Sequence, residues 1–285
     1  MPYRNGDIME EIITSRHNQT IVSICKLTER KHREAGRLFR FDGIKLCAEA
    51  ILAGVEPEII VLRRDGSAEV SERIRSICGK TPGDTGARVI LLENSLFDAV
   101  SEEKSPEGVI TVAKYIDKFH KIVTIDNNSA RFDSLGGRIM LLEDIRDPGN
   151  LGTIMRSAAA LGMDELILCG DCADIYSSKT VRGSMGALFR LRLSLCRDTA
   201  AAVRGIQAAG RRVLAAALTE GALPVKKAGL RSSDCIAIGN EGHGLSATIL
   251  DLADGSVIIP MRAGNESLNA AVAAAVFMWE VCNLD

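Results

Sequence analysis

The chain has 285 residues, with 35 basic and 37 acidic side chains, a formal net charge of −2 and 46% hydrophobic residues. This length suits one large or two ordinary domains, and the near-zero charge excludes a general attraction to nucleic acid while allowing a local basic patch. No apolar run is long enough to span a bilayer, and the start MPYRNGDIMEEI has no signal-peptide core. We therefore expect a cytoplasmic protein without a membrane segment.

Eight cysteines are scattered along the chain, as is typical of buried thiols in a reducing compartment. Cys169 and Cys172 form the one closely spaced pair. A zinc site would need a second pair or nearby histidines, and the chain has only four histidines. We predict no metal ion.

A basic segment near the N-terminus begins with a helix predicted over residues 18–36. Between Arg16 and Arg40 the chain carries seven basic and two acidic side chains. An ordinary solvated helix face and an RNA-binding surface both fit this composition. The candidate RNA-binding residues are Lys26, Arg30, Lys31, Arg33, Arg37 and Arg40.

Residues 14–114 alternate between predicted strands and helices, which indicates a small α/β sandwich. The predicted strands cover residues 38–41, 58–62, 88–92 and 108–113, and the helices after the first cover 43–52, 70–77 and 96–100. Residues 115–135 lose this periodicity, and we interpret them as a linker or a peripheral strand.

A second α/β domain is predicted over residues 136–285. It begins with the apolar run 138–142, and the stretches 165–169, 191–195, 213–218, 235–238 and 257–261 also read as strands. Predicted helices cover 150–161, 178–188, 200–209, 246–252 and the C-terminal end. This alternation predicts a parallel sheet covered by helices, with ligands bound at the carboxyl ends of the strands. The loops after residues 142, 218, 239 and 261 are therefore the places to search.

The first of these loops has the sequence EDIRDPGNLGTIMRSAAALG. Its Asp-Pro-Gly turn precedes Asn150, which can cap the following helix. Arg156 lies six residues later, close to the same side of that helix. Taken alone, a capping asparagine and a surface arginine explain this stretch.

The second loop, Gly-Asn-Glu-Gly-His-Gly at residues 239–244, contains three glycines that let the backbone approach a ligand closely. Its glycine order differs from that of dinucleotide-binding folds, and no phosphate-loop lysine follows. A nucleotide-dependent dehydrogenase is therefore disfavoured. Glu241 is a candidate polar site residue.

The third loop joins the strand ending near Ile259 to a helix that is apolar nearly all round. Ser267 and Asn269 can satisfy the donors at the start of this helix, while Ile259 and Leu268 could flank a flat aromatic group. About 12 apolar residues are too few to span a membrane. We expect this helix to be buried on two sides, against its own domain and against a second surface.

These loops carry a family resemblance. The stretches DPGNLGTIMRSAAALG, IGNEGHGLS and IIPMRAGNESLNAA, in this order, resemble the three signature motifs of the SpoU (TrmH-like) branch of the SPOUT methyltransferases. The stretch KTVRGSMGALFRL between them fits the same family. In the first half, TERKHREAGRLFRFDGIKL and LFDAVSEEKSPEGVITVA resemble a ribosomal-protein-like RNA-substrate-binding domain.

The resemblance implies S-adenosylmethionine-dependent methylation of a ribose 2′-hydroxyl in RNA, in a domain with a deep trefoil knot. By motif position it implies that Leu218, Gly239, Ile259 and Leu268 contact the cofactor. It also implies a catalytic constellation, whose members are Asn150, Arg156, Glu241, Ser267 and Asn269. Since a guanidinium is a reluctant base, we interpret Arg156 as a clamp for phosphate or ribose.

The resemblance further implies a homodimer through the C-terminal helix and RNA binding by the basic segment. Ribosomal RNA is the favoured substrate and transfer RNA the alternative. Methylation that protects against a ribosome-targeting antibiotic, and a non-catalytic RNA-binding protein built on the same fold, are also open at this point.

Overall fold

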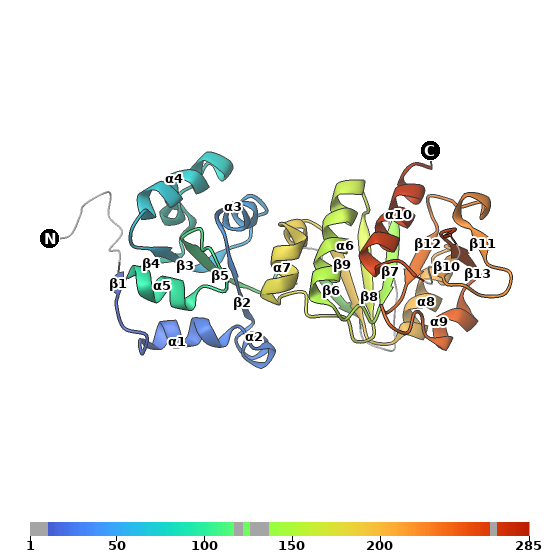
Figure 1. Ribbon diagram of the computed structural model, residues 1–285, viewed down its shortest axis with the longest axis horizontal. Helices are drawn as coiled ribbons and strands as arrows, with labels where there is room; N and C mark the ends of the chain where they lie inside the picture. Colours follow the sequence, from blue (N-terminus) through green and yellow to red (C-terminus); the bar gives the residue numbers. More distant parts are fainter. Residues whose placement is uncertain (1–10, 117–121, 126–136, 263–266, 285) are drawn as a thin grey trace. The chain divides into compact units, whose positions relative to one another are not determined.

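The structure is a computed structural model that describes residues 11–116, 122–125, 137–262 and 267–284 (Figure 1). The chain divides into two compact units. The first comprises Met1–Ile116 and Tyr176–Arg182, and the second comprises Asp117–Ile175 and Gly183–Asp285. Among the described residues no helix has the length and apolar character needed to cross a membrane.

The first unit is built on a five-stranded sheet with the order β1-β4-β3-β5-β2. Strands β1, β4 and β3 run parallel, whereas β5 and β2 are antiparallel to their neighbours. The strands are β1 (Glu11–Ile13), β2 (Leu38–Asp42), β3 (Pro57–Arg63), β4 (Arg88–Leu92) and β5 (Val109–Lys114). The helices are α1 (Gln19–Lys26), α2 (Arg30–Gly36), α3 (Ile44–Leu52), α4 (Ser67–Cys78) and α5 (Asn94–Val100).

Helices cover both faces of this sheet (Figure 1). Alternate residues of β3 and β4 point to opposite faces, so each strand contributes to two cores. Val61 and Ile90 pack with α1 and α5, and Ile60 and Val89 pack with α3 and α4. This explains why the centres of β3 and β4, residues 59–62 and 89–92, are continuously apolar rather than alternating.

The single helix predicted over residues 18–36 is instead two helices. The chain leaves the α-helical pattern after α1, and the guanidinium of Arg33 donates to the carbonyl oxygens of Leu27 and Thr28, both at 2.7 Å. Carbonyls at a helix end need such external partners. The break is therefore stabilised by a side chain from the following helix, which local periodicity does not reveal.

The second unit holds an eight-stranded sheet with the order β11-β13-β10-β12-β7-β8-β9-β6, in which every pair is parallel. The predicted parallel sheet is confirmed. The strands are β6 (Ile122–Ile125), β7 (Ile139–Glu143), β8 (Glu165–Cys169), β9 (Arg192–Cys196), β10 (Val213–Ala216), β11 (Leu223–Pro224), β12 (Cys235–Ile238) and β13 (Gly255–Ile258). Its helices are α6 (Pro148–Leu161), α8 (Thr199–Ala208), α9 (Ala247–Leu252) and α10 (Ala270–Cys282). Helix α7 (Ser178–Ser184) begins in the first unit, which contains its residues up to Arg182.

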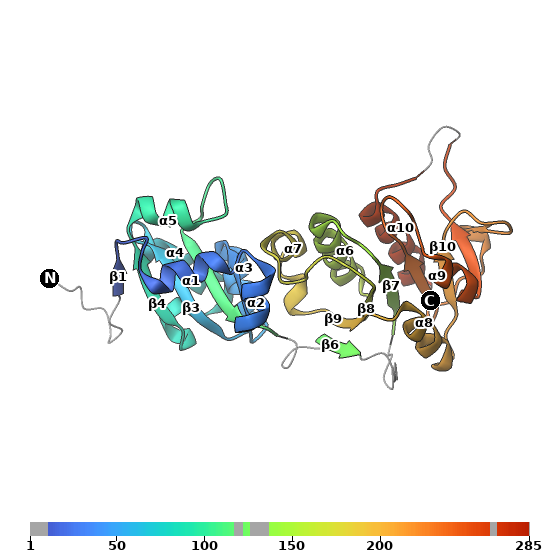
Figure 2. The same cartoon turned by 90° about the horizontal axis from the view of Figure 1, so that it is seen from below.

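Two layers of helices enclose this sheet. Figure 2 shows α6 and α10 on one side of the central strands and α8 on the other. The α8 and α9 side is filled by Ile139, Leu141 and Ile167 from the strands with Val203 and Ile249 from the helices. Burial on both faces again accounts for the continuous apolar runs seen in the sequence.

Several sequence boundaries shift for local reasons. The helix predicted over residues 178–188 ends at Ser184, because Met185 and Gly186 adopt left-handed backbone angles, and a short 3-10 helix follows. Most of the predicted linker, residues 115–135, lies outside the described residues. Its apolar patch forms β6 at one edge of the sheet.

The strand order decides which loops meet. Strands β7, β12, β10 and β13 are consecutive neighbours, so their carboxyl ends lie side by side at one edge of the sheet. The segments after them carry Asn150, in the first turn of α6, and the loop residues Glu241, Leu218 and Ile259. In parallel sheets this edge is where ligands bind.

Candidate active site at the carboxyl edge of the parallel sheet

The loop after β7 leads directly into α6. Asp147 caps this helix, since its Oδ1 accepts a hydrogen bond of 2.8 Å from the backbone N–H of Asn150, and Pro148 occupies the first helical position. The expectation that Asn150 is the cap is therefore wrong: Asn150 supplies the N–H that is capped. Its side chain is consequently available for other contacts.

The Asn150 side chain connects the three loops. Its Nδ2 donates to Glu241 Oε1 at 2.9 Å, and its Oδ1 accepts a hydrogen bond of 3.0 Å from Asn269 Nδ2. We call these three residues the Asn150 triad. Each comes from a different loop, so the triad ties the segments after β7, β12 and β13 together at the carboxyl edge.

Asn269 has a second task, because it caps α10. Its Oδ1 accepts from the backbone N–H groups of Ala271 at 2.9 Å and Val272 at 3.3 Å. The backbone N–H groups of Ala271 and Val272 are therefore bonded to this cap rather than aimed at a ligand. The side-chain amide of Asn269 thus caps α10 through its Oδ1, while its Nδ2 donates to Asn150.

Arg156 and Ser267 lie near the triad in sequence and are both exposed. Arg156 follows Asn150 by six residues on α6, and Ser267 precedes Asn269 by two. Across the described parts of the chain, neither side chain is hydrogen-bonded to a member of the triad. The structure thus links three of the five predicted catalytic residues by hydrogen bonds and leaves the other two side chains exposed outside the triad.

The loop after β12 is compact because glycines allow its two arms to approach. A Cβ on Gly239 would lie 2.3 Å from the backbone carbon of Gly244 and so could not be accommodated. Asn240 and Gly244 exchange backbone hydrogen bonds of 3.0 and 2.9 Å. Glu241 lies at the tip of this loop and Gly239 at its base, at the end of β12.

The predicted cofactor contacts follow the ends of three neighbouring strands. Gly239 follows β12, half-buried Ile259 follows β13, and Leu218 lies two residues beyond β10. Leu218 is 86% exposed, and Leu268 and Met261 are also large exposed apolar residues. Uncovered apolar side chains beside a compact glycine loop suit a ligand with a flat apolar part.

The six basic residues of the predicted RNA-binding segment divide into two groups. Lys26, Arg30, Lys31 and Arg37 are exposed. Arg33 is only 4% exposed and holds the end of α1, while Arg40 is 1% exposed and forms an ion pair of 2.9 Å with Asp42. We therefore remove Arg33 and Arg40 from the candidate RNA surface, since both act inside the first unit.

The closely spaced cysteines, Cys169 and Cys172, are unreactive thiols. Burial raises the pKa of the Cys172 thiol to about 12 and the pKa of the Cys169 thiol well above its usual value. Both thiols are therefore protonated at neutral pH. Within the described residues, no cluster of three or more His, Cys, Asp or Glu side chains could hold a metal ion.

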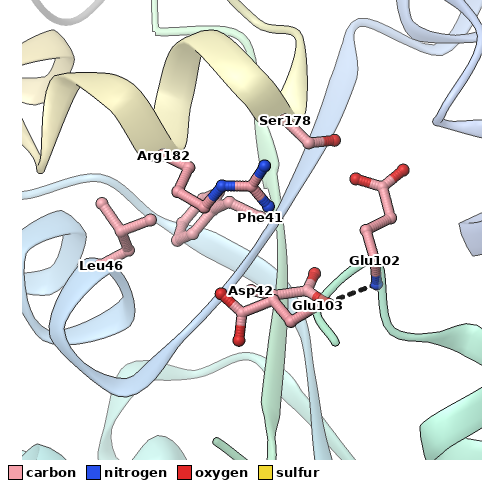
Figure 3. Close-up of a pocket in the computed structure, with 7 residues that line it drawn as sticks. All are labelled: Phe41, Asp42, Leu46, Glu102, Glu103, Ser178 and Arg182. Atoms are coloured by element: carbon pink, nitrogen blue, oxygen red, sulfur yellow. Dashed lines mark hydrogen bonds between the residues drawn. The ribbon is translucent and has the colours of Figure 1, made fainter. Parts of the chain in front are cut away.

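A small cavity in the first unit is separate from the triad. Its lining comes from β2, α3, the loop after α5 and the first turns of α7 (Figure 3). Asp42 Oδ2 accepts hydrogen bonds there from Ser101 Oγ at 2.7 Å and the backbone of Glu102 at 3.0 Å. Burial, followed by the charges of Asp42 and Glu107, raises the pKa of the Glu103 carboxyl. The lining residues are Phe41, Asp42, Leu46, Glu102, Glu103, Ser178 and Arg182.

Comparison with known families agrees with this arrangement. The model of the SpoU rRNA Methylase family matches residues 137–279, and that of the MRM3-like substrate binding domain matches residues 18–111. The first match contains the whole triad and the second contains the exposed basic segment. This chain belongs to the SpoU rRNA methylase family.

Individual relatives cover nearly the full chain. It is 30% identical over 270 residues to the 23S rRNA (guanosine(2553)-2′-O)-methyltransferase RlmP of Bacillus subtilis, covering 94% of this chain and 98% of the relative. It is also 30% identical over 272 residues to a 23S rRNA (uridine(2479)-2′-O)-methyltransferase of Streptomyces viridochromogenes, covering 94% and 90%. A crystal structure of an AdoMet-bound rRNA methyltransferase from Sinorhizobium meliloti superposes with a TM-score of 0.77 at 26% identity, covering 95% and 97%.

Proposed function

We propose that this protein methylates a ribose 2′-hydroxyl of ribosomal RNA, with S-adenosylmethionine as the methyl donor. The observation that carries this proposal is the Asn150 triad, which joins the three family motifs at the edge where parallel sheets bind ligands. The named relatives, which are 23S rRNA 2′-O-methyltransferases, support ribosomal RNA as the substrate.

The residues at the ends of β10, β12 and β13 fit the cofactor. Exposed Leu218 and Leu268 with half-buried Ile259 offer apolar contacts for an adenine ring. Gly239 leaves the backbone at the end of β12 without a side chain that could obstruct a ligand. S-adenosylmethionine supplies an activated methyl group, so the protein's own task is to orient the ribose oxygen in line with it.

In the proposed mechanism, exposed Arg156 binds an RNA phosphate or the ribose and stabilises charge developing on the 2′-oxygen. Ser267, also exposed, contacts the RNA or the cofactor at the third motif. The Asn150 triad keeps these two groups in register, since Asn150 shares α6 with Arg156 and Asn269 follows Ser267 by two residues. The proton of the 2′-hydroxyl then passes to an RNA phosphate or to water.

RNA is held by the first unit in this proposal. The match to a substrate binding domain over residues 18–111 and the exposed Lys26, Arg30, Lys31 and Arg37 support this assignment. Because aromatic residues make up only 4% of the chain, contacts to phosphates and to RNA shape would dominate over base stacking.

The second apolar side of α10 suits a homodimer interface. Ala274, Phe277, Met278 and Val281 face the protein's own core, while Val272 is 50% and Trp279 57% exposed. Val272 and Trp279 are seven residues apart and therefore lie on one helix face. The proposed occupant of this face is α10 of a second copy.

The proposal also includes the deep trefoil knot of the family. In its support, α10 packs against α6 although the preceding strand, β13, lies beyond β10 in the sheet. The chain must therefore return past β12 after β13. Since ribosomal RNA in bacteria lies in the cytoplasm, the proposal also assigns the protein to that compartment.

A methyl-transfer assay with purified components tests the proposed activity. The protein is incubated with labelled S-adenosylmethionine and either ribosomal RNA or transfer RNA, and the product is digested with alkali. We expect label only with ribosomal RNA, in alkali-resistant dinucleotides that report 2′-O-methylation. Label on transfer RNA would reject the proposed substrate, and cofactor binding without transfer to either RNA would favour a non-catalytic RNA-binding protein.

A further inference from the structure

The loop that carries Glu241 is fastened at both ends to two consecutive residues, Glu143 and Asp144. At its start, Asn240 Nδ2 donates to the carbonyl oxygen of Asp144 at 2.9 Å. At its end, the backbone N–H and the Oγ of Ser246 donate to the two carboxylate oxygens of Glu143, both at 2.8 Å. None of these four residues is among the site residues predicted from the sequence.

Glu143 is a buried carboxylate, and among the described residues both of its oxygens accept from one residue, Ser246. It is 4% exposed although it ends β7 at the edge where the triad lies. Hydrogen bonds to a charged acceptor are stronger than neutral ones, and two parallel bonds also fix orientation. Ser246 caps α9 as well, because its Oγ accepts from the backbone N–H of Ile249 at 3.4 Å. Glu143 therefore fixes where the Glu241 loop ends and α9 begins.

Between these anchors the loop has its own internal bonds. Asn240 Oδ1 accepts from the backbone N–H groups of Gly242 at 2.8 Å and His243 at 3.1 Å. These bonds wrap the backbone around Glu241 and set the direction of its side chain. The position of Glu241 relative to Asn150 is therefore determined by the two anchors.

The anchoring residues are themselves held by the neighbouring strand. Asp144 has a left-handed backbone with φ of 52°, its N–H donates to the carbonyl of Cys169 at 3.2 Å, and its Oδ1 accepts from Asp171 N–H at 2.6 Å. Gly170 suits the position beside it, since its φ is +66° and a Cβ there would lie 2.3 Å from that same Oδ1. Asp144, which anchors the start of the loop, is therefore fixed to the segment after β8 as well as to β7.

We propose that Glu143 is a positioning residue for methyl transfer, which acts through Ser246 to hold Glu241 in contact with Asn150. Glu143 does not touch the substrate in this proposal. Its carboxylate holds Ser246, and so fixes the loop that carries the second family motif relative to the end of β7. The inference rests on the proposed function for its kinetic consequence and on the structure alone for its effect on the loop.

The kinetic test compares Glu143→Ala with Glu143→Gln at saturating RNA and cofactor. Alanine leaves both Ser246 donors without their acceptor, and we expect kcat to fall about tenfold or more. Glutamine can accept from the Ser246 N–H and donate to its Oγ, so kcat should recover to within about threefold of wild type. Equal losses in both variants, or no loss in alanine, would overturn the proposal.

A matched control separates positioning from general stability. Asp254 is also a carboxylate that binds a strand, accepting from Val213 N–H at 2.8 Å and Gln207 Nε2 at 3.1 Å, but it lies at the amino ends of β10 and β13. Asp254→Ala should lower the melting temperature while kcat stays within about twofold. A loss of kcat equal to that of Glu143→Ala would mean that stability alone explains the effect.

A double-mutant cycle tests the route through Glu241. If Glu143 acts only by placing Glu241, then Glu143→Ala should cause no further loss of kcat in a Glu241→Ala background. Fully multiplicative losses would contradict this route. Hydrogen exchange gives a readout that needs no activity: Glu143→Ala should speed exchange at the Gly242 and His243 amides, and Asp254→Ala should not. Unchanged exchange rejects the inference, whereas an inactive wild-type protein would reject only the proposed function.

Discussion

The amide of Asn150 donates a 2.9 Å hydrogen bond to the carboxylate of Glu241, although the two residues are 91 positions apart. Asn269, 119 positions from Asn150, completes the triad by donating to the opposite side of the same amide. A single side chain thus satisfies one acceptor and one donor from two other motifs. This amide therefore joins the three motifs through direct hydrogen bonds.

Removing this amide should disconnect the site without unfolding the protein. Asn150→Ala deletes both triad bonds, while the cap of α6 survives because it uses the Asn150 backbone and Asp147. We expect kcat to fall about 10- to 100-fold, since displacing a motif by even 1 Å can cost about 100-fold. Single-turnover methyl transfer measures this. Thr153→Ala, which removes an exposed hydroxyl bonded to Gly149 in the same helix, is the control and should keep near-normal kcat.

The proposed role of Arg156 depends on the shape of its guanidinium. Arg156→Lys keeps the charge but loses the planar fork that binds a phosphate or ribose through two donors. We expect a loss of about tenfold or more in kcat/KM for RNA, with unchanged affinity for S-adenosylmethionine. Near-full activity of the lysine variant would refute the planar clamp and leave only a charge effect.

RNA affinity should separate the exposed basic residues from the buried ones. Replacing Lys26 or Lys31 with Gln should weaken RNA binding and reduce the slope of log K against log salt by about 0.7 to 0.9 per lost phosphate contact. Arg33→Ala should leave that slope unchanged and lower the melting temperature, because Arg33 holds the carbonyls at the end of α1. A reduced slope in Arg33→Ala would show that this buried residue reaches RNA after all.

The exposed face of α10 predicts the oligomeric state. Trp279→Glu places a charge on the proposed interface and should convert a dimer into a monomer in light-scattering measurements. Leu250→Glu replaces another exposed apolar residue of the second unit, on α9, and should leave the dimer intact. Since Trp279 is the only tryptophan in the chain, its fluorescence should shift to the red as the protein is diluted. A monomeric wild-type protein would contradict the assigned interface.

Alkaline pH should destabilise the protein through its buried thiols. Burial raises the pKa of Cys235 from 9.0 to about 12, so the folded state holds this proton more tightly than the unfolded state. The resulting stabilisation is complete below pH 9 and is lost as pH rises toward 12, at up to about 1.4 kcal/mol per pH unit. Cys235→Ala should reduce the decline of unfolding free energy between pH 9 and 10.5. Exposed Cys25 provides the control substitution, and equal declines in both variants would exclude the thiol.

Much of the fold could be predicted because its signals are local. The sequence predicts strands β8 and β12 at the residues where they occur, since the unbroken run of four apolar residues in each suits a strand buried on both faces. The break between α1 and α2 could not be found in this way. It depends on the Arg33 guanidinium reaching back by five and six residues. The same reach explains why a basic residue on a helix was expected at the surface and is buried.

The site was predictable where it resembles known motifs and not where it depends on long-range contacts. The motifs predict the members of the Asn150 triad. They do not reveal that Asp147, rather than Asn150, caps α6. Glu143 and Ser246 are 103 positions apart and carry no shared sequence signal. Their contact follows from the pairing of β7 with β12, which no local pattern specifies. The one sequence feature that distinguishes Glu143 is that it places a charged side chain at the end of an apolar strand.

The central claim is that the Asn150 triad organises a ribosomal RNA 2′-O-methyltransferase. The most direct test maps 2′-O-methyl groups across ribosomal RNA from cells that contain the gene, lack it, or carry the Asn150→Ala variant. We predict one ribose that is methylated with the wild-type gene, unmethylated without it and strongly undermethylated with the variant. Identical methylation maps in the three strains would contradict the account.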